Sequence, residues 1–192
     1  STDAFQTIDS LDILEKKSVY FLPAKVINNN FSKSKNQLTL NKGSNDSVYI
    51  DMGVIAPKGI VGIVSHTSGN FSSVQSVLNT RSQIVAKFQK TNHFGTLVWD
   101  AKDPHIVQLK EIPRIAPLQR GDTIVTDGKS TIFPEGIPIG TVVDFSIAPD
   151  SDYYQIDIRL FTDMTSVKHV YLVRRNKAEE IKSLEMEANN VE

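Results

Sequence analysis

The sequence contains no cysteine, and that absence excludes several classes of protein at once. Without thiols the chain can form no disulfide scaffold, no thiolate zinc site and no cysteine nucleophile. It also lacks an excess of one charge, because 21 Lys and Arg residues face 22 Asp and Glu residues, which disfavours a dedicated nucleic-acid binder. No stretch approaches the ~18 apolar residues of a membrane span, and no signal peptide is visible. With 192 residues, 40% of them hydrophobic, the chain is nevertheless long and apolar enough to fold around a sizeable core.

Helical patterning is scarce and is confined to the two ends of the sequence. Residues 1–17 contain no glycine or proline, and apolar side chains recur there at three-residue steps, at Phe5, Ile8, Leu11 and Leu14. Two interpretations fit this pattern: the end of a coiled coil, or a short amphipathic helix lying on the folded domain. Because the sequence starts at Ser1 rather than Met, we expect a piece of a longer protein, and a membrane anchor is compatible with the missing part. Residues 176–192 offer little apolar area and are expected to form a flexible tail.

Between these ends, from Val19 to Val173, apolar residues follow a period of two, which is typical of half-buried β-strands. One run alternates with polar residues at Tyr154, Ile156, Ile158 and Leu160, and another predicts a single apolar face at Ile139, Thr141, Val143, Phe145 and Ile147. About twelve such segments are separated by short turns rich in Gly, Asn and Pro. The sequence therefore predicts an all-β protein with two six-stranded β-barrel-like domains, because closure removes exposed sheet edges.

The division of these strands between the two barrels is open from the sequence. We favour an insertion, in which residues 18–52 and 118–175 form the first barrel and residues 53–117 form the second. The proline-containing segment from Ile112 to Gly121 is typical of a linker that returns to the first domain. A sequential division near residue 90 also assigns six strands to each barrel.

The sequence shows no recognisable catalytic or metal-binding constellation. The four histidines (His66, His93, His105 and His169) lack the spacings that place two metal ligands on one element. Six residues separate Gly121 from Gly128, where a phosphate-binding P-loop has four between its glycines. No Gly-x-Ser-x-Gly elbow of a Ser-His-Asp hydrolase is present. We therefore expect no catalytic residue, no cofactor and no metal site.

Glycine and proline instead mark a specific signature. The block Gly121-Asp-Thr-Ile-Val-Thr-Asp-Gly128 is followed by Phe133-Pro-Glu-Gly-Ile-Pro-Ile-Gly-Thr-Val142. Earlier segments are Leu38-Thr-Leu-Asn-Lys-Gly-Ser44, Asp51-Met-Gly-Val-Ile55, Gly59-Ile-Val-Gly-Ile-Val64 and Gly95-Thr-Leu-Val-Trp99. In this order they resemble the family of the rod shape-determining protein MreC. Two turn positions depart from the family pattern, because Asp127 stands where Ser is usual and Ser47 where Gly is frequent.

The resemblance implies a structural role for the residues that carry the motifs. Strand glycines usually mark a bulge, a barrel corner or a close approach of two backbones. The motif residues are Gly43, Gly53, Gly59, Gly62, Gly121, Asp122, Gly128, Phe133, Pro134, Gly136 and Gly140.

The resemblance also implies a function. Proteins of this family have one transmembrane helix, a coiled coil and two β-domains outside the bacterial inner membrane, and no known catalytic activity. This chain would then be the periplasmic part of a non-catalytic scaffold that maintains cell shape and organises peptidoglycan synthesis. The implied partners are the elongation class B penicillin-binding transpeptidase, RodA, MreD and MreB, together with self-association as a dimer or filament. No nucleic acid is expected among the partners.

Aromatic side chains are the candidates for partner binding, because aromatics dominate the energetics of protein interfaces. They are Phe71, Phe94, Trp99, Phe133, Tyr153 and Tyr154. The alternative for each is a place in a barrel core, since large aromatics are mostly buried. Two other functions stay open from the sequence: an envelope-associated β-barrel hydrolase, which needs a Ser–His pair, and a peptidoglycan-binding module, which needs exposed stacked aromatics.

Overall fold

The structure is a computed structural model that describes residues 19–175 and 184–189. The strands, with one 3-10 turn η1, are β1 (Val19–Asn29), β2 (Lys35–Leu40), η1 (Ser44–Asp46), β3 (Gly53–Ala56), β4 (Gly59–Thr67), β5 (Ser72–Asn79), β6 (Ile84–Phe88), β7 (Phe94–Val98), β8 (Ile106–Lys110), β9 (Thr123–Thr126), β10 (Pro138–Ile147), β11 (Tyr154–Leu160) and β12 (His169–Arg175). Residues 184–189 form a short helix within the segment expected to be a flexible tail. The helix expected over residues 1–17 lies outside the described residues.

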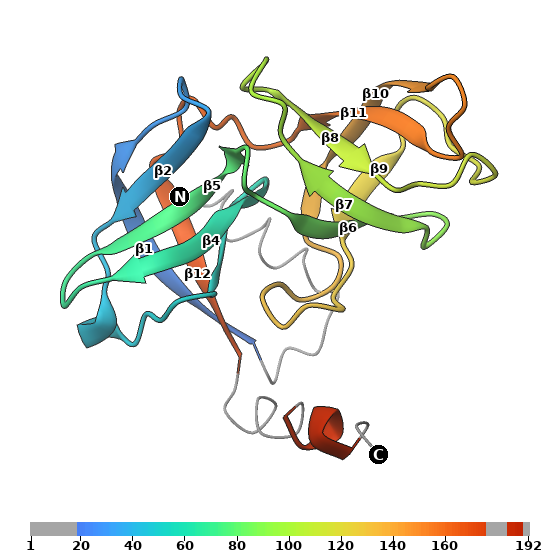
Figure 1. The fold of residues 1–192 in the computed structure, drawn as a ribbon. Helices are drawn as coiled ribbons and strands as arrows, with labels where there is room; N and C mark the ends of the chain where they lie inside the picture. The colour runs from blue at the N-terminus through green and yellow to red at the C-terminus, as the bar shows by residue number, and fades with distance from the viewer. Residues whose placement is uncertain (1–18, 176–183, 190–192) are drawn as a thin grey trace.

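The twelve described strands close into two antiparallel barrels of six strands each. The first barrel has the order β1-β12-β3-β4-β5-β2, and the second has the order β10-β11-β8-β7-β6-β9. Figure 1 shows the two barrels side by side, with the orange β12 lying among the blue and green strands of the first barrel. The prediction of an all-β protein with two six-stranded barrels is therefore confirmed.

The second barrel is inserted between β5 and β12 of the first. The chain leaves the first barrel after β5 and returns at β12, which pairs with both β1 and β3. β3 to β5 thus belong to the first barrel, and β9 to β11 belong to the second.

The strand membership of each barrel differs from the expected ranges. Residues 53–79 are not part of the inserted barrel, and residues 123–160 are not part of the first. A period of two identifies a strand but carries no information about which strand lies beside it. The segment from Ile112 to Gly121 connects β8 to β9 inside the second barrel, where Pro113 forms an isolated bridge with Tyr153.

β10 departs from simple alternation in the middle of its length. Its register with β11 shifts between Val142 and Asp144, which is a β-bulge. A bulge exchanges the inward and outward faces of a strand. Val142 before the bulge and Phe145 after it pair with the core residues Ile158 and Ile156, so Thr141 does not share a face with Phe145. The single apolar face expected along this strand is therefore wrong.

Aliphatic side chains fill both barrels. Representative buried residues are Leu38, Leu40, Val54, Val74 and Leu172 in the first barrel and Leu97, Leu109, Ile124, Ile156 and Ile158 in the second. β3 is buried at every residue, because one of its faces covers the first core while the other contacts the second barrel. A strand covered on both faces loses the alternation of buried and exposed residues.

Candidate functional site

The most specific part of the signature forms the connection between β9 and β10, residues 127–137, which we call the arm. Figure 1 shows the arm leaving the second barrel on the side that faces the first barrel. The side chain of Phe133 is buried against β3, and a Cβ atom on Gly53 would lie 2.6 Å from its ring. A Cβ on Gly59 would likewise overlap the carbonyl oxygen of Pro138, where the arm ends. Glycine at these two strand positions permits the close contact of the two barrels.

The root of the arm is fastened to the second barrel. Thr126 Oγ1 donates a hydrogen bond to the Pro134 carbonyl oxygen at 2.6 Å and accepts one from the Ile137 amide at 2.9 Å. Glu135 forms an ion pair with Lys87, whose side chain is only 10% exposed and also donates to Asn92 Oδ1. These bonds hold the arm in one conformation and so determine where Phe133 is placed.

The other motif residues serve strand packing or turns. Gly43, Gly62 and Gly140 lie where an added Cβ would overlap the backbone of a neighbouring segment. Turn residues with positive φ are Gly121, Gly128 and Gly136. The buried carboxylate of Asp122 accepts a hydrogen bond from the Gln119 amide at 2.9 Å and closes the turn before β9. None of these residues is among those that line the groove described below.

The six candidate aromatics do not form one surface. Trp99 is 5% exposed and Phe133 is 3% exposed, so both take the alternative place in a core, and we do not propose them as partner-binding residues. Trp99 belongs to the core of the second barrel and donates its indole N–H to the Asp103 carbonyl oxygen at 2.9 Å. Tyr154 is half-buried and packs edge-to-face on Phe145, with ring centroids 5.9 Å apart.

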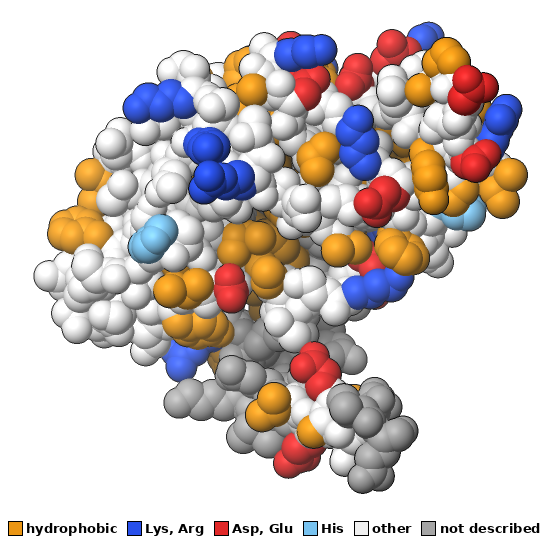
Figure 2. All heavy atoms as spheres, in the orientation of Figure 1, with side chains coloured by type: hydrophobic (Ala, Val, Ile, Leu, Met, Phe, Trp, Pro, Cys, Tyr) orange, Lys and Arg blue, Asp and Glu red, His pale blue; other side chains and the backbone are white. Residues whose placement is uncertain are grey.

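Three candidate aromatics remain on the surface. Phe71 is 48% exposed at the β4–β5 hairpin, Phe94 is 51% exposed at the start of β7, and Tyr153 is 51% exposed just before β11. The Lys129 ammonium lies 3.0 Å above the Phe94 ring. In Figure 2, hydrophobic side chains on the visible face form several separate groups with charged residues between them.

Ile115 is a further exposed apolar residue that the sequence reasoning missed. Its side chain is 85% exposed, and its loop is joined to the Tyr153 turn by the Pro113–Tyr153 bridge and by the Arg114 amide, which donates to the Asp152 carbonyl oxygen. Its position inside a segment with two prolines is the one signal that could have placed it in an exposed loop.

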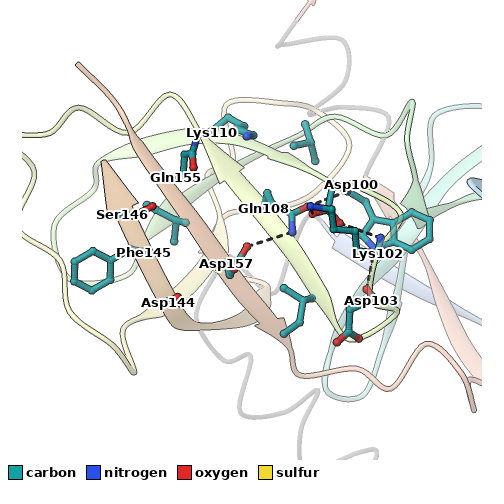
Figure 3. A pocket seen from close by; sticks show the side chains of 14 residues that line it. Asp100, Lys102, Asp103, Gln108, Lys110, Asp144, Phe145, Ser146, Gln155 and Asp157 are labelled. Carbon is teal, nitrogen blue, oxygen red and sulfur yellow. Dashed lines mark hydrogen bonds and ion pairs between the residues drawn. The ribbon is translucent and has the colours of Figure 1, made fainter. Parts of the chain in front are cut away.

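The outer face of the second barrel carries a polar depression of about 620 Å³, which we call the groove. It extends over β8, β10 and β11 and is walled on one side by the loop that follows β7 (Figure 3). Its lining residues are Val98, Trp99, Asp100, Lys102, Asp103, Ile106, Gln108, Lys110, Asp144, Phe145, Ser146, Gln155, Ile156 and Asp157. Sequence reasoning did not single out this surface, because its residues meet only through the pairing of strands distant in sequence.

Hydrogen bonds order the floor of the groove. Gln108, which is 9% exposed, accepts a hydrogen bond from the Asp100 amide at 2.9 Å and donates one to Asp157 Oδ1 at 3.3 Å. Asp144 lies directly opposite Asp157 on the neighbouring strand. An Arg120 hydrogen bond at 2.9 Å, together with the Phe145 amide, lowers the pKa of the Asp144 carboxyl below its usual value, against a smaller opposing effect of burial.

The Ser65–His66 pair of the described residues lacks the geometry of a hydrolase triad. The imidazole Nδ1 of His66 lies 3.1 Å from Ser65 Oγ, but that hydroxyl donates to the Ser73 carbonyl oxygen. A Ser–His nucleophile requires the imidazole to accept the hydroxyl proton and a third group to orient the ring. Within residues 19–175 and 184–189 no carboxylate bonds to His66, and no group of three His or acidic side chains is placed to hold a metal ion. The same residues include no helix of the length and apolarity that crossing a bilayer requires.

The fold thus defines a double β-barrel protein in which the signature residues Gly53, Gly59 and Phe133 lie at the contact between the barrels, and whose outer faces carry exposed aromatics and a polar groove. The family model "Rod shape-determining protein MreC, barrel core" matches residues 26–174. The chain belongs to the MreC family.

Individual relatives agree with this assignment. The chain is 31% identical over 172 residues to the cell shape-determining protein MreC of Listeria monocytogenes, covering 88% of this chain and 58% of that protein. It is 26% identical to the protein of that name from Streptococcus pneumoniae, covering 90% of this chain and 65% of the relative. The chain therefore spans less than two thirds of the length of either relative.

Solved structures share the fold. A structure of MreC from Listeria monocytogenes superposes with a TM-score of 0.76 at 29% identity, covering 91% of this chain and 85% of that one. A complex between the penicillin-binding protein PBP2 and MreC from Helicobacter pylori contains a chain that superposes with a TM-score of 0.64 at 16% identity, covering 81% of this chain and 97% of that one.

Proposed function

We propose that this chain is the periplasmic part of a single-pass inner-membrane protein that acts as a non-catalytic scaffold for bacterial cell elongation. Its role would be to bind and organise the enzymes of peptidoglycan synthesis and so to maintain cell shape. The observation that carries the proposal is the complex of a family member of the same double-barrel fold with a penicillin-binding protein. The elongation class B penicillin-binding transpeptidase is accordingly the partner we propose first. RodA, MreD and MreB, and self-association as a dimer or filament, complete the proposed set.

The geometry supports binding rather than chemistry. The motif residues serve strand packing, turns and the contact between the barrels, of which the burial of Phe133 against Gly53 is the example. The solvent-exposed surface outside this contact carries Phe71, Phe94 and Tyr153, each about half exposed. Large half-exposed aromatics are the side chains that most often contribute strongly to protein interfaces. We therefore propose these three as partner-binding residues.

The proposal is tested by measuring the affinity of the 192-residue chain for the periplasmic region of the elongation transpeptidase from the same organism, with the upstream coiled coil restored in a parallel sample. Phe71→Ala, Phe94→Ala and Tyr153→Ala are compared with Phe31→Ala, a matched control because Phe31 is a partly exposed phenylalanine outside the proposed set. At least one of the three should weaken binding about tenfold or more, while the control stays near the wild-type value. Absence of binding in both samples would contradict the scaffold function.

A further inference from the structure

The groove on the second barrel is lined by more acidic than basic side chains. Four carboxylates line it, from Asp100, Asp103, Asp144 and Asp157, against two ammonium groups, from Lys102 and Lys110. Figure 3 shows Lys110 beside Gln155 at one end of the groove and Lys102 beside Asp100 and Asp103 at the other, with Asp157 between them. The lining residues carry a net formal charge of −2, which becomes −1 when Arg120, the ion-pair partner of Asp144, is included.

The register of the sheet concentrates that charge. Asp144 on β10 and Asp157 on β11 are a directly opposed cross-strand pair. Like charges placed directly opposite each other on neighbouring strands destabilise a sheet. Arg120 compensates Asp144, but in the part of the chain that the structure describes no Lys, Arg or His forms an ion pair with Asp157. The only hydrogen bond that the Asp157 carboxylate accepts in that part is donated by the side-chain amide of Gln108.

Apolar surface adjoins the uncompensated carboxylate. The side chains of Val98 and Ile106 line the groove and are half-buried rather than sealed in the core. Val98 is the cross-strand neighbour of Gln108, which is itself the neighbour of Asp157. An apolar wall next to an anionic floor suits a Lys or Arg side chain, which buries its methylene stem on apolar atoms and directs its charged head to a carboxylate. A metal cation does not fit, because no group of three His or acidic ligands converges in the described residues.

We propose that the groove binds a basic segment of a partner polypeptide, with an Arg or Lys head group on Asp157 and its stem against Val98 and Ile106. The ordered Gln108 fixes the receiving carboxylate before the partner arrives, which lowers the cost of binding. This inference rests on the proposed scaffold function, since it names the chemistry of a partner segment. It assigns to the outer face of β8, β10 and β11 a role that the exposed aromatics do not supply.

The test is a titration of the ¹⁵N-labelled 192-residue chain with acetyl-(Arg-Gly)₃-amide as the probe, followed through backbone amide shifts. A peptide with citrulline in place of arginine is the control, because it keeps the shape and removes the charge. Saturable shifts at Gln108, Gln155 and Asp157 are expected with the arginine peptide only.

Asp157→Asn should weaken the binding of the arginine peptide about fivefold, since the substituted amide keeps an acceptor for Gln108 but loses the charge. Asp152→Asn is the matched control, because Asp152 is exposed on the turn before β11 and lies outside the groove. The same spectra report whether each variant is folded. Equal weakening by the two variants, equal binding of the citrulline peptide, or no saturable shift in the groove would each overturn the inference. None of these results bears on the transpeptidase measurement, which uses a different ligand and different variants.

Discussion

The arm and the groove, two regions of the second barrel, differ in the chemistry of their side chains. On the arm side, the buried ring of Phe133 lies against Gly53 of β3, and two ion pairs, Lys87–Glu135 and Lys129–Asp127, involve residues of the arm. On the groove side, carboxylates, amides and ammonium groups stand on an open sheet, and two aspartates face each other across neighbouring strands. The first arrangement is optimised for stability, whereas the second tolerates an electrostatic cost. The most recognisable part of the sequence signature therefore lies at the contact between the barrels, and the surfaces that we propose for partner binding lie elsewhere.

The largest effect is expected from Phe133→Ala. Removal of this buried ring leaves a cavity between the arm and β3, so the free energy of unfolding should fall by about 3–5 kcal/mol. Phe94→Ala is the control, because that ring is 51% exposed and its contact with Lys129 should contribute about 1 kcal/mol or less. Urea denaturation of both variants measures the difference. Equal losses of stability in the two variants would show that the buried Phe133 ring stabilises the protein no more than the exposed Phe94 ring does.

Gly53→Ala should come next. The new methyl group would lie 2.6 Å from the Phe133 ring and 2.8 Å from the Ile132 carbonyl oxygen, so the arm must move away, at a cost of about 1–3 kcal/mol. Gly69→Ala provides the comparison, since its Cβ would meet only the flexible side chain of Asn45 at 3.2 Å. That control should stay within about 0.5 kcal/mol of wild type. A tolerated Gly53→Ala variant would mean that β3 and the arm do not need this close approach.

Removing one or the other partner of the Lys87–Glu135 ion pair should change the stability by unequal amounts. Glu135→Ala leaves the ammonium of Lys87, a side chain only 10% exposed, without its carboxylate, and should cost about 2 kcal/mol. Lys87→Met leaves Glu135, whose side chain is 49% exposed, free to be solvated, and should cost about 1 kcal/mol or less. Thermal unfolding of the two variants at equal ionic strength gives the order. The reverse order would contradict the burial assigned to Lys87.

The smallest change in stability is expected in the groove. Asp157→Asn removes one charge of the opposed aspartate pair, so stability should change by less than about 0.5 kcal/mol and in the stabilising direction. Asp152→Asn removes the same charge from a turn and should leave stability near the wild-type value. Chemical denaturation measures both. A loss above about 1 kcal/mol for Asp157→Asn would show that this carboxylate is a structural residue, as the arm residues are.

The sequence predicts the number and class of the strands well, because alternation depends on local burial. The run at Ile156, Ile158 and Leu160 lies on a described strand with these three residues buried. Barrel membership could not be predicted, because β12 joins β1 and β3 through contacts more than one hundred residues apart in the chain. The bulge between Val142 and Asp144 was equally hidden, and it reverses the faces of the rest of β10.

The candidate site was predictable only in part. Phe71, Phe94 and Tyr153 are exposed, whereas Trp99 and Phe133 are buried, and composition alone does not separate these two groups. Burial of Phe133 depends on Gly53, a partner in the other barrel. The groove was missed because the pairing of Asp144 with Asp157 depends on register and not on spacing.

The most direct test of the role of the arm is whether it makes the two barrels tumble as one body. ¹⁵N relaxation of the 192-residue chain gives a rotational correlation time for the amides of each barrel separately. We predict the same correlation time for both barrels in the wild type and two different, shorter times in Phe133→Ala. Two different times in the wild type, or a single unchanged time in the variant, would contradict the assignment of the signature residues to the contact between the barrels.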